Sequence, residues 1–185
     1  SQADGSAYTM VYFTPGINYI YLKSYGSKNY EYYIKVEDGF KQGTQFTSNG
    51  IKYKVTSISS STSGVCSVVG GSKTNIVIPK TVVYQGATFD VTSIAKNAFK
   101  NNKQIKTVKT ASYNYLKSIG KEAFKGCKKL NVLNFMWCKN LKKFGKNCFY
   151  GISKGADIYV YKRSMYTKLC KTSGVPGGVW IHWMW

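Results

Sequence analysis

The residue types that carry most enzyme chemistry are scarce in this sequence, whereas lysine is abundant. His182 is the only histidine, and 27 Lys and Arg stand against seven Asp and Glu, giving a formal net charge of +20. General-base and nucleophilic catalysis usually need a histidine or a carboxylate beside the reacting group. After residue 91 the only acids are Glu122 and Asp157, which leaves two-carboxylate glycosidase chemistry and divalent-metal binding almost without candidates. We expect no enzyme activity, no metal site and no cofactor.

Lysines recur at a fixed spacing, which favours anion binding. On coils stacked at strand spacing, about 4.7–4.9 Å apart, they would form columns of like charge within a screening length of about 8 Å. A linear polyanion along the stack would relieve that repulsion. Alternatively, duplication of the repeat copied each lysine into every unit, and these lysines only keep a β-rich surface soluble and prevent it from pairing with other chains. Lys117 and Lys142 share one column; the candidate polyanion-binding residues are Lys96, Lys100, Lys103, Lys121, Lys125, Lys128 and Lys146.

A surface of this charge attracts anionic glycans, cell-wall phosphate polymers, nucleic acid or acidic proteins. We do not expect nucleic acid to be the physiological partner. No apolar run is long enough to span a membrane, so we expect no membrane insertion. Residues 1–4 have neither the basic start nor the apolar core of a signal peptide, so we expect a processed chain or a piece of a longer protein.

The elements that must position these side chains are repeats of 25 residues. Residues 94–100, 119–125 and 144–150 align with one another, and such a period is typical of a solenoid. Each unit predicts a strand, a shorter strand and a single helical turn. Phe99, Phe124 and Phe149 should stack as a ladder in the core.

The flanking segments predict caps for this stack. Residues 46–58 and 81–92 predict hairpins, with turns at Ser48-Asn49-Gly50 and Gln85-Gly86. Residues 156–161 predict a strand, and residues 163–172 predict an amphipathic helix that closes the end. In the final strand, 179–185, we expect the tryptophans to cover the open end, or else to dock a partner or a sugar.

The predicted fold class is a β-rich α+β solenoid with a hairpin cap at the N-terminal end and a helix-plus-strand cap at the C-terminal end. We assign residues 41–72 to the hairpin cap, 73–152 to the repeats and 153–185 to the C-terminal cap. Residues 1–40 hold eight of the 16 tyrosines and predict two or three antiparallel strands, as a further cap or the tail of a preceding domain. Those tyrosines pair across strands or form a sugar-stacking face.

The outward side chains of the long strands are a second binding candidate. Side chains alternate between the two faces of a strand, and exposed apolar or aromatic residues mark contact surfaces. Partial burial under a cap is the alternative. By register, three outward rows form: Val77, Lys109, Asn134 and Tyr159; Pro79, Ala111, Met136 and Tyr161; Asn75, Thr107, Val132 and Asp157. The candidate ligand-binding residues are Lys109, Asn134, Met136, Trp137, Tyr159 and Tyr161.

The five cysteines are an odd number and include no Cys-x-x-Cys pair, which disfavours metal and thioredoxin-like sites. Cys148 takes a position that is alanine in the other repeats, as a small core residue would. We expect mostly free, buried thiols, with room for one disulfide.

Residues 116–130, Leu-Lys-Ser-Ile-Gly-Lys-Glu-Ala-Phe-Lys-Gly-Cys-Lys-Lys-Leu, resemble the BspA-type (Treponema-type) leucine-rich repeat of bacterial surface and secreted proteins. Ile76-Val77-Ile78-Pro79 is similar to the Ile-x-Ile-Pro strand of that family. The resemblance covers about residues 41–179 and implies a short curved solenoid, export, and adhesion or ligand binding as one module of a longer protein. The chain departs from the pattern at Cys148, and at residues 135–138 in place of the usual Ile-Pro turn.

The sequence therefore predicts a non-enzymatic extracellular module, secreted or on a bacterial cell surface, that binds a host or matrix protein through its concave strand face. One alternative is attachment to an anionic glycan or cell-wall polymer through the lysines. Another is a structural or assembly subunit of a surface protein. The ligand and the oligomeric state stay open.

Overall fold

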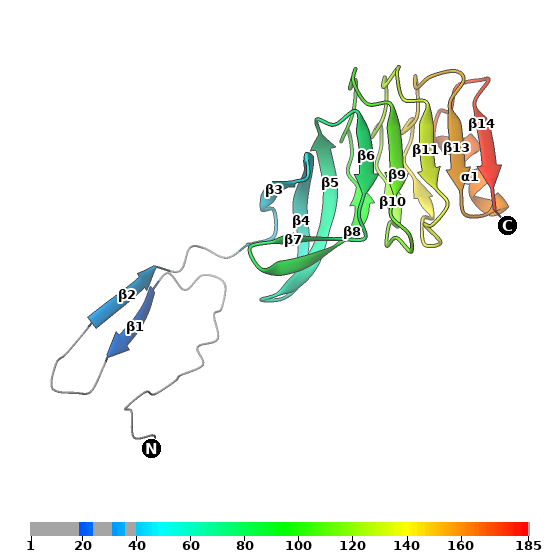
Figure 1. Ribbon diagram of the computed structural model, residues 1–185. Helices are drawn as coiled ribbons and strands as arrows, with labels where there is room; N and C mark the ends of the chain where they lie inside the picture. Colours follow the sequence, from blue (N-terminus) through cyan, green and yellow to red (C-terminus); the bar gives the residue numbers. More distant parts are fainter. Residues whose placement is uncertain (1–18, 24–30, 36–39, 185) are drawn as a thin grey trace. The chain divides into compact units, whose positions relative to one another are not determined.

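The computed structural model describes residues 19–23, 31–35 and 40–184, and the chain divides into two compact units, Ser1–Lys41 and Gln42–Trp185. In the first unit, strands β1 (Tyr19–Lys23) and β2 (Glu31–Lys35) pair antiparallel (Figure 1). The sequence predicted two or three strands in this region, and two of them are described. The third expected segment, residues 9–13, and the side chains of this tyrosine-rich region lie outside the described residues.

The second unit is a β-solenoid whose successive coils add strands to two sheets (Figure 1). One sheet has five parallel strands in the order β14-β13-β11-β9-β6. Val108, Leu133 and Ile158 lie side by side in it, so the 25-residue period of the sequence is the length of one coil. The predicted solenoid is confirmed. The strands are β6 (Asn75–Ile78), β9 (Thr107–Thr110), β11 (Val132–Phe135), β13 (Asp157–Val160) and β14 (Trp180–Trp183).

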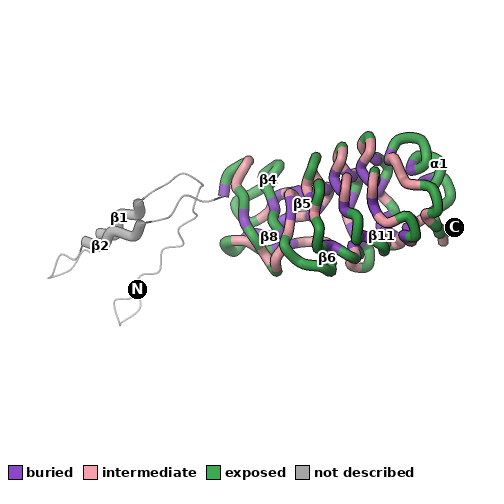
Figure 2. Tube along the Cα trace, turned by 90° about the horizontal axis from the view of Figure 1, so that it is seen from above, coloured by how far each residue is buried: buried purple, intermediate pink, exposed green. Residues whose placement is uncertain are grey.

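The other sheet has seven strands and joins the hairpins to the repeats. Its order is β12-β10-β8-β5-β4-β3, with β7 paired to β8. Ile94, Ile119 and Phe144 stand next to one another on its parallel strands. The core lies between the two sheets, and Figure 2 shows the buried residues running along the coils. The strands are β3 (Gln45–Ser48), β4 (Ile51–Ser60), β5 (Ser63–Gly71), β7 (Thr81–Tyr84), β8 (Ala87–Ile94), β10 (Ser118–Ile119) and β12 (Lys143–Phe144).

Both predicted hairpins close through two-residue turns. Asn49 and Gly50, with φ of 48° and 72°, join β3 to β4; Gln85 and Gly86, with φ of 48° and 75°, join β7 to β8. Two successive positive φ values define a type I′ turn, whose twist matches that of the strands, and Asn-Gly is a preferred sequence for it. The hairpin cap predicted from these turn residues is confirmed.

A ladder of phenylalanines fills the core along the stack, as the repeat predicted. The ring centroids of Phe99 and Phe124 are 5.2 Å apart with planes 5° apart, and those of Phe124 and Phe149 are 5.8 Å apart at 22°. All three side chains are buried. Offset aromatic pairs of this kind contribute about 0.5–1.5 kcal/mol beyond the burial of their area.

The predicted helical turn between the sheets is wrong. Asn97, Glu122 and Asn147 each have a left-handed φ, between 56° and 60°, which a right-handed helix does not allow. These segments are chains of tight turns in which the backbone amides alternate, one donating within the turn and the next to the neighbouring coil. The amide of Glu122, for example, donates to the carbonyl of Lys146 at 3.1 Å. Every second backbone amide of the turn thus holds neighbouring coils together instead of bonding internally.

Two glycines allow the coils to approach this closely. A Cβ placed on Gly120 would lie 2.5 Å from the backbone nitrogen of Lys96, and one on Gly145 would overlap the backbone nitrogen of Lys121. Real Cβ atoms do not approach backbone atoms so closely, so a side chain here would push neighbouring coils apart. The glycine that follows the short strand in each of these repeats is therefore required by the stacking distance.

Helix α1 (Arg163–Thr172) closes the C-terminal end of the stack, at the predicted residues. Met165 and Leu169 are buried on one face of it. The backbone amide of Phe149 donates to the carbonyl of Ser173 at 2.8 Å. In the earlier repeats the equivalent amide, for example that of Phe124, donates to a carbonyl in the turn of the following coil. The end of the helix thus replaces the missing next coil.

The aromatic tail extends the five-stranded sheet. Ile181 of β14 pairs with Ile158 of β13 in parallel register. Trp180 is 68% exposed and Trp183 is 44% exposed. Trp180 aligns with the outward Asp157, so the expectation that the tryptophans cover the open end is wrong for Trp180. Trp183 aligns with the buried Val160 and packs against Tyr166 of α1, with ring centroids 5.6 Å apart, so it lies against the helix that closes the stack. Trp185 lies outside the described residues.

The five cysteines are free thiols, as expected. Four are buried, and Cys170 is exposed on α1. Burial raises the pKa of the Cys66 and Cys148 thiols to about 12 and that of the Cys127 and Cys138 thiols to about 11. The thiolate is the reactive form, so these four are core residues with little reactivity at neutral pH.

Replacing Phe124 by Ala should lower the free energy of unfolding by about 3–5 kcal/mol, because it removes the middle ring of the ladder and leaves a cavity. Denaturant unfolding followed by circular dichroism measures the change. Tyr150→Ala, at an exposed aromatic on the same turn as Phe149, is the control and should change stability by less than about 1 kcal/mol. Equal losses for both variants would contradict the ladder's role.

Gly120→Ala should destabilise the fold by about 1–3 kcal/mol, because the added methyl group meets the backbone of the preceding coil. Gly155→Ala is the matched control, since a Cβ there meets no atom within 4 Å and should leave stability within about 0.5 kcal/mol. A thermal melt of both variants tests the pair. A neutral Gly120→Ala would show that the coils tolerate wider spacing.

Candidate functional site

The outer face of the five-stranded sheet carries a row of five aligned side chains. On each strand alternate residues are buried in the core, and those between them point away from it. Strand pairing aligns the four residues predicted for this middle row and adds a fifth from β14. The row is Val77, Lys109, Asn134, Tyr159 and His182.

A second row runs beside it at the start of the same strands. Its predicted alignment is also found, and β14 again adds a residue, here Trp180. The Thr107 hydroxyl donates to the Asn75 side-chain oxygen at 3.0 Å, so neighbouring rungs are tied across the row. The row is Asn75, Thr107, Val132, Asp157 and Trp180.

The C-terminal ends of the two rows form one group of side chains, here called the aromatic patch: Asp157, Tyr159, Trp180 and His182. The His182 ring stacks on Tyr159 with centroids 4.5 Å apart and planes 16° apart, and its Nε2 lies 2.8 Å from Asp157 Oδ1. Sequence reasoning placed His182 in a strand but did not set its register. Aligning the tail with β13 through its alternating pattern would have found the pair.

Three of the six predicted ligand residues lie away from the middle row. Met136 is half-buried, and its backbone amide donates to Asn134 Oδ1 at 3.1 Å, so Asn134 is partly engaged in holding the strand end. Trp137 follows β11 and packs against Tyr113, with ring centroids 5.8 Å apart. Trp137 and Tyr161 line a pocket of about 490 Å³ at the carboxyl ends of the strands.

The predicted lysine columns are stacked, but they differ in electrostatic character. Lys96, Lys121 and Lys146 are exposed on successive turns, and backbone bonds such as Asn97 to Lys121 (3.0 Å) join those turns. Glu122 lies between Lys100 and Lys125, 2.7 Å and 3.3 Å from their ammonium groups. The hydrogen bond from Lys100, and to a smaller extent the one from Lys125, lowers the pKa of the Glu122 carboxyl. The charge of that column is therefore partly compensated.

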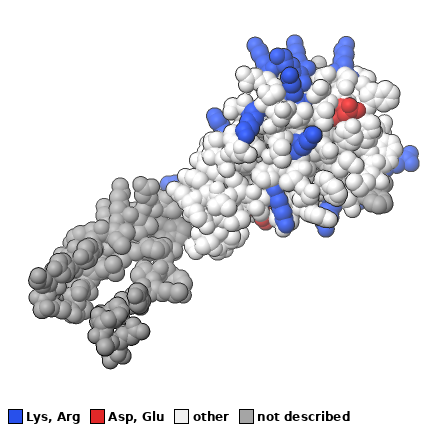
Figure 3. All heavy atoms as spheres, in the orientation of Figure 1, with Lys and Arg blue, Asp and Glu red and all other residues white. Residues whose placement is uncertain are grey.

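Lys103 and Lys128 lie together, as the column predicted, in a shallow depression of about 480 Å³ that Lys129 also lines. Figure 3 shows lysine and arginine side chains gathered along one edge of the face in view, with few acids among them.

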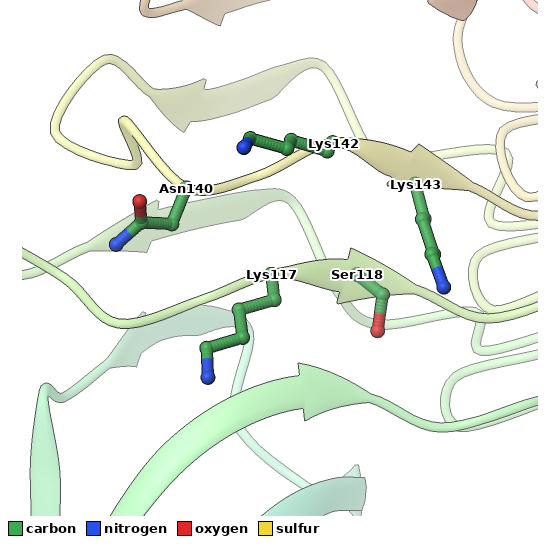
Figure 4. Close-up of a pocket in the computed structure, with 5 residues that line it drawn as sticks. All are labelled: Lys117, Ser118, Asn140, Lys142 and Lys143. Atoms are coloured by element: carbon green, nitrogen blue, oxygen red, sulfur yellow. The ribbon is translucent and has the colours of Figure 1, made fainter.

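A second lysine depression, of about 440 Å³, lies beside strands β10 and β12. Its lining residues are Lys117, Ser118, Asn140, Lys142 and Lys143. In Figure 4, Lys117 and Lys142 extend to the side on which Asn140 lies, and Lys143 extends toward the strand of Ser118. Lys117 and Lys142 are the pair that the sequence placed in one column.

Within the described part of the chain, no group of three or more His, Cys, Asp or Glu could hold a metal ion. No helix among the described residues is long and apolar enough to cross a membrane. The chemistry that these surfaces offer is binding: aromatic stacking and apolar contact on the outer face, and attraction of anions at the lysine depressions.

Three solved structures are similar to parts of this chain, and one of them matches with a TM-score above 0.5. A leucine-rich repeat protein from Bacteroides capillosus ATCC 29799 matches with a TM-score of 0.51 at 18% identity, over 75% of this chain and 98% of that one. A leucine rich cell surface protein from Faecalibacterium prausnitzii A2-165 has a TM-score of 0.49 at 16% identity, over 76% of this chain. A leucine-rich repeat protein from Bacteroides ovatus ATCC 8483 has a TM-score of 0.46 at 23% identity, over 75% of this chain. The match spans only 43% and 37% of the last two proteins.

Comparison with curated proteins finds no match. The sequence of residues 72–169 matches the family model described as "BspA type Leucine rich repeat region", in six copies. That span holds the repeats and most of α1, and it confirms the resemblance carried by the 25-residue unit. The chain therefore belongs to the BspA-type leucine-rich repeat family.

Proposed function

We propose that this chain is a non-enzymatic binding module of a bacterial surface or secreted protein, and that it binds a host or matrix protein through the outer face of its five-stranded sheet. Membership of the BspA-type family supports an interaction or adhesion role. The observation that carries the proposal is the aromatic patch, exposed at the C-terminal end of that face.

The aromatic patch has the composition of a binding hot spot. Tryptophan and tyrosine dominate the energetics of protein interfaces because they bury a large area at a low cost in side-chain entropy. Trp180 is 68% exposed. His182 follows it two residues later on the same face of β14 and stacks on Tyr159 of β13. A partner that covered this patch would remove aromatic surface from water.

The rest of the outer face supports a protein partner of mixed character. Val77 is 56% exposed at the far end of the middle row, and Lys109 lies between it and Asn134. An apolar residue of the partner would pack on Val77, and an acidic one would pair with Lys109. Because both lie on hydrogen-bonded strands, binding requires no ordering of the backbone at these positions.

A second candidate function is attachment to an anionic polymer through the lysines. The formal net charge of +20 and the depression shared by Lys103, Lys128 and Lys129 favour it. Glu122 argues against the full set of columns, because it compensates Lys100 and Lys125. The two candidates use different surfaces and respond differently to salt.

The double variant Tyr159→Ser, Trp180→Ser should lose at least about 30-fold in affinity for the matrix protein that the parent chain captures on an array, because a hot spot is worth about 2 kcal/mol or more. Surface plasmon resonance gives the affinity. Tyr150→Ser, at an exposed tyrosine away from the sheet, is the control and should bind like the parent. Unchanged binding by the double variant would exclude the outer face.

Salt separates the two candidates. In about 0.5 M NaCl the screening length falls to about 4 Å, so attraction between exposed charges is largely lost. Binding through the aromatic patch should then stay within about threefold of its value in physiological salt. A loss of more than about tenfold in the same titration would instead assign the binding to the lysines.

A further inference from the structure

A pocket at the carboxyl ends of the five parallel strands lies apart from the outer face. In a parallel sheet all the loops that follow the strands meet at one edge, and here the coils from β6 to β14 each contribute lining residues. The volume of about 490 Å³ falls within the range of about 300–1,000 Å³ typical of small-ligand sites. The side chains that carry the argument are Lys80, Tyr113, Trp137, Lys139, Asn140 and Tyr161.

Aromatic rings form one wall of this carboxyl-edge pocket. Tyr113 is 76% exposed and Trp137 is 42% exposed, and their rings meet at 45°. Tyr113 has a left-handed φ of 51°, which is uncommon for a bulky residue and persists only where the surroundings impose it. The wall is thus held open to solvent at a cost in backbone energy.

A buried asparagine imposes that conformation. Asn114 is 2% exposed; its side-chain nitrogen donates to the Ile78 carbonyl at 3.1 Å, and its Oδ1 accepts from the Leu116 amide at 2.9 Å. Its backbone amide also donates to the Trp137 carbonyl at 3.2 Å. These bonds tie the Tyr113 loop to the coils on both sides and hold in place the backbone segments that carry the two rings.

The polar groups of the pocket are cationic or neutral. Lys80 Nζ lies 4.5 Å from the centre of the Tyr115 ring, which holds its ammonium group at the wall. Lys139 and Asn140 add a second ammonium and an amide, and no carboxylate is among the described lining residues. The pocket therefore attracts an anion and also offers an amide to hydroxyl groups.

The pocket borders a lysine depression, with one lining residue in common. Asn140 lines both the carboxyl-edge pocket and the depression of Lys117, Lys142 and Lys143 in Figure 4. A chain molecule with one unit in the pocket would therefore carry its next units over three further ammonium groups. Its negative charges would have to repeat along the chain.

We propose that the carboxyl-edge pocket binds one unit of a linear acidic glycan. A pyranose ring packs its C–H face on Trp137 and Tyr113, because those hydrogens carry partial positive charge and the ring faces are negative. Asn140 bonds its hydroxyls, and a uronate carboxylate pairs with Lys80 or Lys139. The following units lie over Lys117, Lys142 and Lys143. The site does not depend on the proposed protein-binding face.

The aromatic wall distinguishes this site from simple charge attraction. A flexible acidic peptide would satisfy the lysines but has no apolar ring face to cover Tyr113 and Trp137. A neutral sugar would cover the rings but leave the lysines without a partner. Both stacking and charge are satisfied by a uronate-containing saccharide.

Isothermal titration of the full chain with tetragalacturonate and with a hyaluronan tetrasaccharide tests the proposal. We expect at least one to bind, with Trp137→Ala and Tyr113→Ala each weakening it at least about tenfold. Trp180→Ala, at the exposed tryptophan of the aromatic patch, should stay within about twofold. Circular dichroism and melting temperature establish that each variant is folded, and Trp137→Phe should recover most of the affinity if a ring face is what binds.

Three outcomes would overturn the proposal: failure of both tetrasaccharides to bind, equal affinity for the carboxyl-reduced tetrasaccharide, or equal affinity for polyglutamate of matched charge. An unchanged affinity in folded Trp137→Ala would overturn it as well, by placing the saccharide elsewhere. Because the outer-face variant Tyr159→Ser, Trp180→Ser should keep saccharide binding, failure here is distinguishable from failure of the proposed protein-binding function.

Discussion

The close stacking of backbone coils is the constraint on which the rest of this structure depends. Each coil bonds the next through both sheets and through the turns between them, and Gly120 and Gly145 lie where a Cβ would strike the coil before. A repeat unit buries its apolar face only against its neighbours, so the stability of each coil depends on the coils beside it. The phenylalanine ladder, the buried thiols and the C-terminal helix all fill or close this one arrangement.

Stacking separates residues that must repeat from residues that are free to vary. Core positions see the same apolar surroundings in every coil, so they stay apolar: phenylalanine recurs in the column of Phe124, and the column of Leu133 holds valine, leucine and isoleucine. Outward positions see solvent and differ from rung to rung, from Val77 through Lys109 to Tyr159. The fold therefore presents a rigid frame with aligned, variable side chains, which is the physical basis of a binding surface on a solenoid.

The charge of the molecule is not distributed as one uniform layer. Glu122 compensates Lys100 and Lys125 on one turn, whereas Lys117, Lys142 and Lys143 share a depression whose described lining has no acid. The aromatic patch offers apolar contact on the outer face, and the carboxyl-edge pocket combines rings with lysines. Surfaces with different chemistry thus follow from one stack: the aromatic patch lies on the outer face of the five-stranded sheet, and the carboxyl-edge pocket and the lysine depression that borders it lie at the strand ends and beside β10 and β12.

The sequence by itself determined the period, the strands, the hairpin turns, the final helix and the register of the outward rows, since alternation within strands and repetition between coils are local patterns. It failed where long-range contacts decide. Left-handed φ at Glu122 replaced the expected helical turn, because bonds to the next coil compete with helical ones. The pairing of His182 with Asp157 and the pocket around Trp137 each join side chains from different coils. The C-terminal tail likewise found its place by pairing with the strand of another coil. Only the closed stack brings such residues together.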